Sequence, residues 1–217
     1  METINFEDIL KDENLLRGIY AYGFENPSNI QSKAIPYILE GRDIIAQSQS
    51  GTGKTGAFLI GALSTINFEI NDIQKLILAP THELAIQIYT IIKELSKYLT
   101  IKIELIIGKT SIKDSIQKLQ SSPHIVIGTP GRILDMIHRK QLFTSNINSL
   151  ILDEADEILS QGFLDNIYNI IRSIPSNTQI CLFSATIPND IMTLTENFMN
   201  NPLKILVNNQ ELTLEGI

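Results

Sequence analysis

Residues 44–58 read IIAQSQSGTGKTGAF, and this stretch decides the fold. An apolar pair runs into small and polar residues, and an apolar run resumes after a lysine and a threonine. Bare backbone N–H groups at the start of a helix can wrap the anionic oxygens of a nucleoside triphosphate, and side chains would obstruct that approach. The stretch therefore predicts a strand, a phosphate-binding loop and a helix in succession.

The loop follows the pattern G-x-x-x-x-G-K-[ST], except that Ser48 stands where the first glycine usually is. Lys54 can reach the β and γ phosphates, and the Thr55 hydroxyl can ligate Mg²⁺. On this motif alone, a glycine-rich turn with an incidental lysine stays an alternative. The residues expected to bind nucleotide here are Ser50, Gly51, Thr52, Gly53, Lys54 and Thr55.

Outside this stretch, short β-branched runs alternate with segments of helical spacing. Several runs are apolar on successive residues, which is typical of strands buried on both faces of a parallel sheet. The pattern predicts an α/β fold, a three-layer sandwich with a mostly parallel sheet, in which ligands bind at the carboxyl ends of the strands. The predicted strands lie within 42–47, 75–80, 101–108, 123–130, 149–156, 179–186 and 203–208. Predicted helices include 83–98, 111–120, 132–138 and 188–199.

An acidic pair ends the predicted strand in SLILDEAD, residues 149–156. Asp153 can hold Mg²⁺ through water, and Glu154 can orient or deprotonate an attacking water. A solvated acidic helix start is the alternative for these residues alone. Together with the phosphate loop they predict an Mg²⁺-dependent nucleoside triphosphatase, with Lys54, Asp153 and Glu154 as catalytic residues and with Thr55 and Asp153 as metal ligands.

Residues 153–156 spell D-E-A-D, and the chain resembles the amino-terminal RecA-like P-loop NTPase lobe of DEAD-box ATP-dependent RNA helicases over nearly all of its length. GFENPSNIQ, residues 23–31, is similar to the Q motif, which recognises adenine in that family. The resemblance implies that the Gln31 amide reads the adenine edge, that Phe24 stacks on its face, and that the cofactors are ATP and Mg²⁺. Phe6 matches an isolated upstream aromatic of the family.

Three further segments resemble the motifs that contact RNA backbone in the family: PTHELA at 80–85, Gly108-Lys109 and TPGR at 129–132. His82 stands where the family usually has arginine, so we expect a weaker grip on phosphate unless Lys109 restores charge. A helix-start residue without a ligand is the alternative for His82. The RNA-binding residues that the resemblance implies are Pro80, Thr81, His82, Gly108, Thr129, Pro130, Gly131 and Arg132.

SAT at 184–186 matches a motif that couples ATP turnover to strand separation, which implies coupling roles for Asp156, Ser184 and Thr186. Single-stranded or weakly paired RNA is the implied partner. Because the formal net charge is -7, bulk charge cannot hold nucleic acid, and backbone N–H groups at helix starts must contribute. Such contacts predict sequence-tolerant binding that favours RNA through its 2′-hydroxyls.

Other side chains are expected to be structural. The single cysteine, Cys181, lies in an apolar run, which excludes an intrachain disulfide and favours a buried hydrophobe. His124 and His138 lack the spacing of metal ligands. No apolar run reaches the roughly 18 residues needed to span a membrane, so we expect an intracellular protein, cytoplasmic or nuclear.

The resemblance also divides the chain: an N-terminal extension and first helix at 1–22, the RecA-like ATP-binding helicase domain at 23–208, and the start of an interdomain linker at 209–217, with the second lobe absent. Within the family, several segments resemble the eukaryotic initiation factor four-A class, translational or exon-junction type, whose proteins are possible partners. Without a second lobe we expect weak nucleotide binding and little hydrolysis. A non-catalytic module that binds RNA or a helicase partner is the alternative. A DNA-directed ATPase would fit the phosphate loop but not the Q motif or D-E-A-D.

Overall fold

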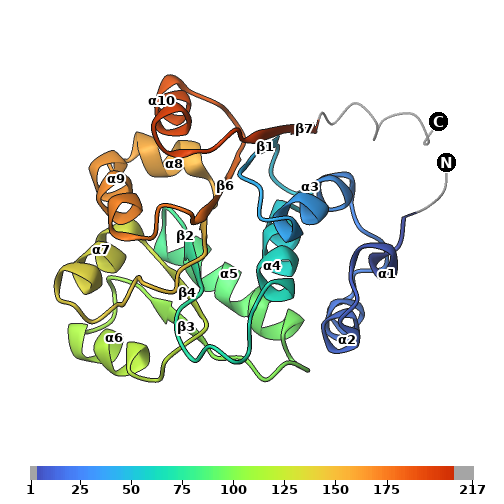
Figure 1. The fold of residues 1–217 in the computed structure, drawn as a ribbon, viewed down its shortest axis with the longest axis horizontal. Helices are drawn as coiled ribbons and strands as arrows, with labels where there is room; N and C mark the ends of the chain where they lie inside the picture. The colour runs from blue at the N-terminus through green and yellow to red at the C-terminus, as the bar shows by residue number, and fades with distance from the viewer. Residues whose placement is uncertain (1–3, 208–217) are drawn as a thin grey trace.

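The sheet of this protein runs through the middle of the molecule in the computed structural model, which describes residues 4–207 (Figure 1). Within that range seven strands pair in the order β3-β4-β2-β5-β6-β1-β7, and every pair is parallel. Six of these strands lie inside a predicted run and β1 passes the end of its run, 42–47, by one residue, so a strand is confirmed in every predicted run. The strands are β1 (Ile44–Ser48), β2 (Lys75–Leu78), β3 (Ile103–Ile106), β4 (Ile125–Gly128), β5 (Ser149–Leu152), β6 (Gln179–Ser184) and β7 (Leu203–Val207).

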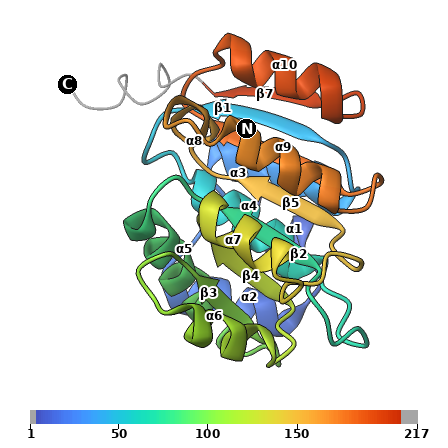
Figure 2. The ribbon, with the colours of Figure 1, turned by 90° about the vertical axis from the view of Figure 1, so that its left-hand side faces the viewer.

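Helices cover both faces of the sheet, as Figures 1 and 2 show. One layer holds α1 (Phe6–Ile9), α2 (Glu13–Tyr22), α3 (Asn29–Leu39), α4 (Lys54–Ser64) and α5 (His82–Leu95). The other holds α6 (Ile112–Leu119), α7 (Pro130–His138), α8 (Ala155–Ser160), α9 (Leu164–Ser173) and α10 (Asn189–Phe198). This arrangement is the predicted three-layer sandwich.

Two apolar clusters, one on each face of the sheet, hold the layers together. Along β2, Ile77 belongs to the cluster with α1–α5, whereas Leu76 and Leu78 belong to the cluster with α6–α10. Successive side chains of a strand point to opposite faces, so a strand covered on both faces must be apolar at every position. This explains why the strands read as continuous apolar runs rather than alternating ones.

The N-terminal helices belong to this body because α2 approaches α5 very closely. A Cβ atom at Gly18 would lie 2.0 Å from the carbonyl oxygen of Leu95, so glycine is required where the helices meet. Leu15 and Ile19 of the same helix are buried in the α1–α5 cluster. The predicted linker at 209–217 lies outside the described residues.

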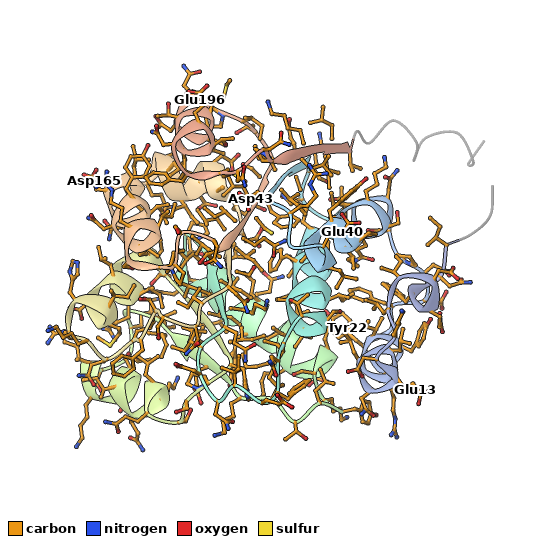
Figure 3. All side chains as sticks on the ribbon, in the orientation of Figure 1. Glu13, Tyr22, Glu40, Asp43, Asp165 and Glu196 are labelled. Atoms are coloured by element: carbon orange, nitrogen blue, oxygen red, sulfur yellow. The ribbon has the colours of Figure 1, made fainter. Side chains whose placement is uncertain are left out.

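Polar groups fix the end of the sheet opposite the phosphate loop. The Asp43 carboxylate accepts hydrogen bonds from the backbone N–H groups of Ile180 and Asn200, at 2.8 and 2.7 Å, and so joins β1 to β6 and to the segment before β7 (Figure 3). Lys75 is 3% exposed, and its ammonium donates to Asn148 Oδ1 at 2.7 Å. Burial lowers the pKa of Lys75 to about 8.

Cys181 is fully buried, as predicted, and burial raises the pKa of its thiol. His124 is buried as well, and its Nδ1 accepts from the backbone N–H of Lys102 at 3.1 Å. Residues 4–207 contain no group of three or more His, Cys, Asp and Glu side chains that could hold a metal ion. None of the helices in residues 4–207 is long and apolar enough to cross a membrane.

Candidate active site and adjoining groove

The phosphate loop joins β1, which ends at Ser48, to α4, which begins at Lys54. Gly51 and Gly53 have φ angles of 81° and 95°, in the left-handed region that glycine adopts without steric penalty. The Ser48 hydroxyl is hydrogen-bonded to the Thr52 hydroxyl, which also donates to the carbonyl of residue 49 at 2.8 Å. The serine that departs from the motif therefore ties the two sides of the loop together.

The predicted adenine residues lie directly against this loop. Gln31 is 2% exposed, its Oε1 accepts from the backbone N–H of Ser28 at 2.9 Å, and its Nε2 donates to the carbonyl of Gly53 at 3.2 Å. A Cβ atom at Gly56 would lie 2.5 Å from Gln31 Nε2 and 3.1 Å from the ring of Phe24. The start of α3 and the start of α4 thus form one packed unit.

Aromatic side chains extend this packed unit toward the N-terminal helices. The Phe6 ring is fully buried, and its centroid lies 6.4 Å from that of Phe24 with an interplanar angle of 27°. The Tyr22 ring meets Phe24 edge-on, with 4.9 Å between centroids. The structure therefore brings together Phe6 and Phe24, which lie in separate segments of the sequence.

The charged residues of the site meet where β1 and β5 end. Lys54 is 5% exposed, and its Nζ lies 3.3 Å from Glu154 Oε1. Glu154 has φ 48° and ψ 53°, a left-handed conformation that is uncommon for a residue other than glycine. The three predicted catalytic residues Lys54, Asp153 and Glu154 are thus adjacent.

Asp153 is 2% exposed, and its Oδ1 accepts from the backbone N–H of Glu154 at 3.0 Å. Burial raises the pKa of Asp153 to about 7, the Glu154 carboxylate adds to the rise, and Lys54 opposes it. A buried carboxylate in this position is suited to a cation. With Thr55 in the first turn of α4 it would supply one or two protein oxygens, which is the usual protein share of an Mg²⁺ site that also uses phosphate oxygens.

The predicted coupling residues form a hydrogen-bonded cluster beside Glu154. Thr186 donates to Asp156 Oδ2 from its hydroxyl at 2.6 Å and from its backbone N–H at 3.0 Å. The backbone N–H of Asp156 donates to Ser184 Oγ at 3.2 Å. Burial alone would raise the pKa of Asp156, but hydrogen bonds from Thr186 and Ser184 outweigh it and hold the pKa below its usual value. The Gln47 amide, donating to the carbonyl of Ala185 at 3.2 Å, ties this cluster to β1.

A groove of about 500 Å³ opens next to this site, at the carboxyl ends of β2, β3 and β4, which are neighbours in the sheet. It is lined by Pro80, Thr81, His82, Glu83, Gly108, Lys109, Thr129, Gly131, Arg132 and Phe163. Every residue implied to bind RNA lies on it except Pro130, which is buried at the start of α7. Sequence reasoning did not identify Phe163, and it included Glu83 only as a member of PTHELA, with no role of its own.

Arg132, for which the resemblance implies RNA binding, is hydrogen-bonded within the protein. Its NH1 donates to Ser115 Oγ at 2.8 Å and to the carbonyl of Thr110 at 3.1 Å, and its NH2 donates to the carbonyl of Gly108 at 3.1 Å. These bonds brace the loop that follows β3. Across the groove, a Cβ atom at Gly108 would lie 3.2 Å from His82 Nε2.

A second ion pair stands at the rim of the groove. Lys109 Nζ lies 2.8 Å from Glu83 Oε1, and the two side chains are 64% and 73% exposed. The hydrogen bond from Lys109 lowers the pKa of Glu83. Unlike the pair between Lys54 and Glu154, this one is open to solvent.

Sequence comparison gives concordant matches. A model of the DEAD/DEAH box helicase family matches residues 28–194. The ATP-dependent RNA helicase fal1 of Schizosaccharomyces pombe is 51% identical over 213 residues, which cover 98% of this chain and 54% of that protein. The ATP-dependent RNA helicase eIF4A of Candida albicans is 53% identical over 212 residues, which cover 98% of this chain and 53% of that protein. The chain spans about half the length of these relatives.

Solved structures match the fold closely. A DEAD box protein from the hyperthermophile Methanococcus jannaschii has a TM-score of 0.91 at 40% identity, over 96% of this chain and 57% of that one. A Saccharomyces cerevisiae Dbp5 variant bound to RNA and ADP BeF3 has a TM-score of 0.86 at 36% identity, over 97% of this chain and 54% of that one. The predicted RecA-like fold is confirmed.

Proposed function

This chain belongs to the DEAD/DEAH box helicase family, and we propose that it is the nucleotide-binding lobe of an ATP-dependent RNA helicase. The observation that carries the proposal is the meeting of Lys54, Asp153 and Glu154 beside a loop against which Gln31 packs. A phosphate loop, a buried acidic pair and an amide that can read adenine are the parts that an Mg²⁺-dependent ATPase needs.

Different groups of this chain would bind the phosphates, the adenine and the metal ion. Backbone N–H groups of residues 50–55 surround the phosphates, and Lys54 binds the β and γ phosphates. Gln31 and Phe24 hold the adenine, by hydrogen bonds to its edge and by stacking on its face. Thr55 and Asp153 would hold Mg²⁺, which when bound neutralises charge on the phosphate oxygens.

Glu154 is the proposed base, and its proposed link to the nucleotide runs through Lys54. Lys54 Nζ lies 3.3 Å from Glu154 Oε1. A phosphate that takes over the ammonium of Lys54 would release the Glu154 carboxylate, which can then accept the proton of an attacking water. Binding of the substrate and exposure of the base are thereby linked through one side chain.

RNA is the proposed second ligand, along the groove formed by the starts of α5 and α7 and the loop after β3. Asp156, Ser184 and Thr186 would report the state of the nucleotide toward the rest of the enzyme, because Asp156, two residues after Glu154, is hydrogen-bonded to both of the others. The relatives are helicases of about twice this length, so hydrolysis and unwinding are proposed for this lobe joined to a second one. Partners of the initiation-factor or exon-junction type, and an intracellular location in cytoplasm or nucleus, are proposed on the same basis.

Nucleotide binding by this chain tests the proposal first. We expect ADP with Mg²⁺ to bind, as measured by titration calorimetry or a fluorescent ADP analogue. Lys54→Ala should weaken binding at least about tenfold, because a charge-assisted contact to phosphate is lost. Lys97→Ala, at an exposed position outside both sites, is the matched control. Equal ADP affinity in all three proteins would contradict the proposed phosphate site.

ATP hydrolysis with and without single-stranded RNA then separates the lobe from a complete enzyme. We expect little RNA-stimulated turnover by this chain above the Lys54→Ala blank, and turnover once a second lobe is joined. An arginine from a partner element contributes about 10³–10⁵ in rate in comparable phosphoryl transfers. Strong RNA-stimulated turnover by the lobe alone would show that its site needs no second lobe. The alternative of a non-catalytic module is disfavoured because Lys54, Thr55, Asp153 and Glu154 are all present.

A further inference from the structure

Three side chains of the groove can carry positive charge, and they differ in what else they bind. The guanidinium of Arg132 donates to carbonyls of the loop after β3 and to Ser115. His82 lies against Gly108. Lys109 projects from the rim, and its partner is the Glu83 carboxylate at 2.8 Å. Arg132 is therefore committed to the protein, whereas Lys109 is positioned to change partners.

The pair formed by Lys109 and Glu83 is suited to such an exchange. Both side chains are mostly exposed, and an ion pair in water contributes little to stability. A lysine ammonium has three donors and turns freely on its stem, so it can leave a carboxylate for a phosphate oxygen. Because the whole chain carries a net charge of -7, a local cation at the groove has a large influence on where an anionic backbone settles.

We propose that Lys109 is the phosphate-binding cation of this groove, and that Glu83 holds its ammonium at the rim until an RNA phosphate replaces the carboxylate. This inference rests on the proposed function, since it assigns a role within the RNA site. It accounts for how a groove with histidine at position 82 and a committed arginine at position 132 can still attract phosphate. Glu83 lowers the affinity because its carboxylate competes with phosphate for the same ammonium.

Salt-dependent RNA binding by this chain tests the inference. A short labelled oligouridylate is titrated by fluorescence anisotropy at several salt concentrations with the parent, Lys109→Ala, Glu83→Gln and the control Lys97→Ala. One lost phosphate contact on a single strand lowers the slope of log affinity against log salt by about 0.7, which corresponds to about fivefold weaker binding at about 0.1 M salt. We expect this for Lys109→Ala, and tighter binding, by about two- to threefold, for Glu83→Gln.

The outcomes separate the inference from the function on which it rests. A parent chain that binds oligouridylate, with Lys109→Ala matching the parent in affinity and salt slope, would overturn the role of Lys109 while the RNA site stands. Weaker binding by Glu83→Gln would overturn the competition between carboxylate and phosphate. A parent chain that binds no oligouridylate at any protein concentration reached, while still binding ADP, would overturn both the inference and the RNA part of the proposed function.

Discussion

The nucleotide site and the groove lie at the same end of one sheet, yet they hold their charges in opposite ways. The nucleotide site uses the ends of β1, β5 and β6, where Lys54 and Asp153 are almost entirely buried and the lysine is paired with Glu154. The groove uses the ends of β2, β3 and β4, where Lys109 and Glu83 are mostly in solvent. Half the sheet thus presents charges that are largely shielded from water, and the other half presents charges that are open to solvent.

This difference follows from what each half would bind. A triphosphate has a fixed shape, so it binds most tightly to charged groups that are already in place and shielded from water. Electrostatic interactions strengthen there because the local dielectric is low. An RNA backbone can be bound whatever its sequence by charged side chains that adjust their position to it. Such side chains stay hydrated until they bind. Burial of charge therefore suits the proposed ATP hydrolysis in the nucleotide site, and exposure of charge suits sequence-tolerant RNA binding in the groove.

Glu154→Gln, in the protein joined to its second lobe, gives the largest expected effect. The change keeps size and shape but removes the proposed base, so ATP turnover should fall by about 10²–10⁴ while ATP binding is retained. Glu157→Gln makes the same change at an exposed position of α8 and should leave turnover near the parent value. Retained turnover in Glu154→Gln, measured by phosphate release, would reject Glu154 as the base.

Lys75 sharpens the comparison because it is buried like Lys54, yet the side chain to which it donates, Asn148, is neutral. Its folded-state pKa of about 8 lies below the usual 10.5, so between these pH values the unfolded chain binds the proton and the folded chain does not. The free energy of unfolding should therefore rise as pH increases through this window, and should be lowest below pH 8, where the buried side chain is charged.

Lys75→Met should consequently be more stable than the parent at pH 7, by about 1–3 kcal/mol. The advantage should shrink as pH rises from about 8 to 10.5, because the parent loses the same charge there. Urea denaturation at a series of pH values measures both effects, with the exposed Lys97→Met as control. A stability difference that stays constant with pH would refute the buried charge as its cause.

One glycine from each region tests how tightly the two are packed. A Cβ atom at Gly56 would meet the Gln31 amide at 2.5 Å, whereas the nearest atom to one at Gly131 is Asn166 Nδ2 at 3.9 Å. Gly56→Ala should displace Gln31 and weaken ADP binding about tenfold. Gly131→Ala should leave ADP affinity and melting temperature close to the parent values. Calorimetry measures the ADP affinity of both variants, and thermal unfolding measures their melting temperatures. A larger loss in Gly131→Ala than in Gly56→Ala would contradict the difference in packing.

Arg132→Lys gives the smallest expected change. A lysine cannot reproduce the forked bonds to Gly108, Thr110 and Ser115, so the free energy of unfolding should fall by about 1 kcal/mol. Arg139→Lys, which alters an exposed pair with Asp135 on α7, should fall within a few tenths of the parent. Urea denaturation measures both free energies of unfolding. A larger loss in Arg139→Lys than in Arg132→Lys would contradict the stabilising role of the Arg132 hydrogen bonds.

The strands and the nucleotide residues were predictable because their signals are local. A continuous apolar run identifies a strand that is buried on both faces, and the spacing from Gly51 to Thr55 identifies the loop after it. The bounds of α3 were harder to predict from the sequence. Pro36 lies inside this helix, and its capping residue, Ser28, donates a hydrogen bond to the distant carbonyl of Thr52. Propensity describes the segment alone, whereas this helix is fixed by tertiary contacts.

In the groove, the sequence indicated which segments take part but not how their side chains are used. Arg132 reads as a free cation, yet its acceptors come from a loop that only the sheet order brings near it. Phe163 enters the groove from the turn between α8 and α9, far along the chain from the other lining residues. Neither fact has a signature in spacing or composition, because both depend on which strands are neighbours.

The edge strand β7 has a mechanical consequence. It pairs only with β1 in the described sheet, residue for residue, from Ile44 beside Leu203 to Ser48 beside Val207. A pull along the chain beyond Val207 would load these parallel pairs in shear, all together, rather than peel them apart one at a time. The last of them, Ser48, is also the residue whose hydroxyl closes the phosphate loop. Tension on that end of the lobe would thus reach the loop across a single pair of strands.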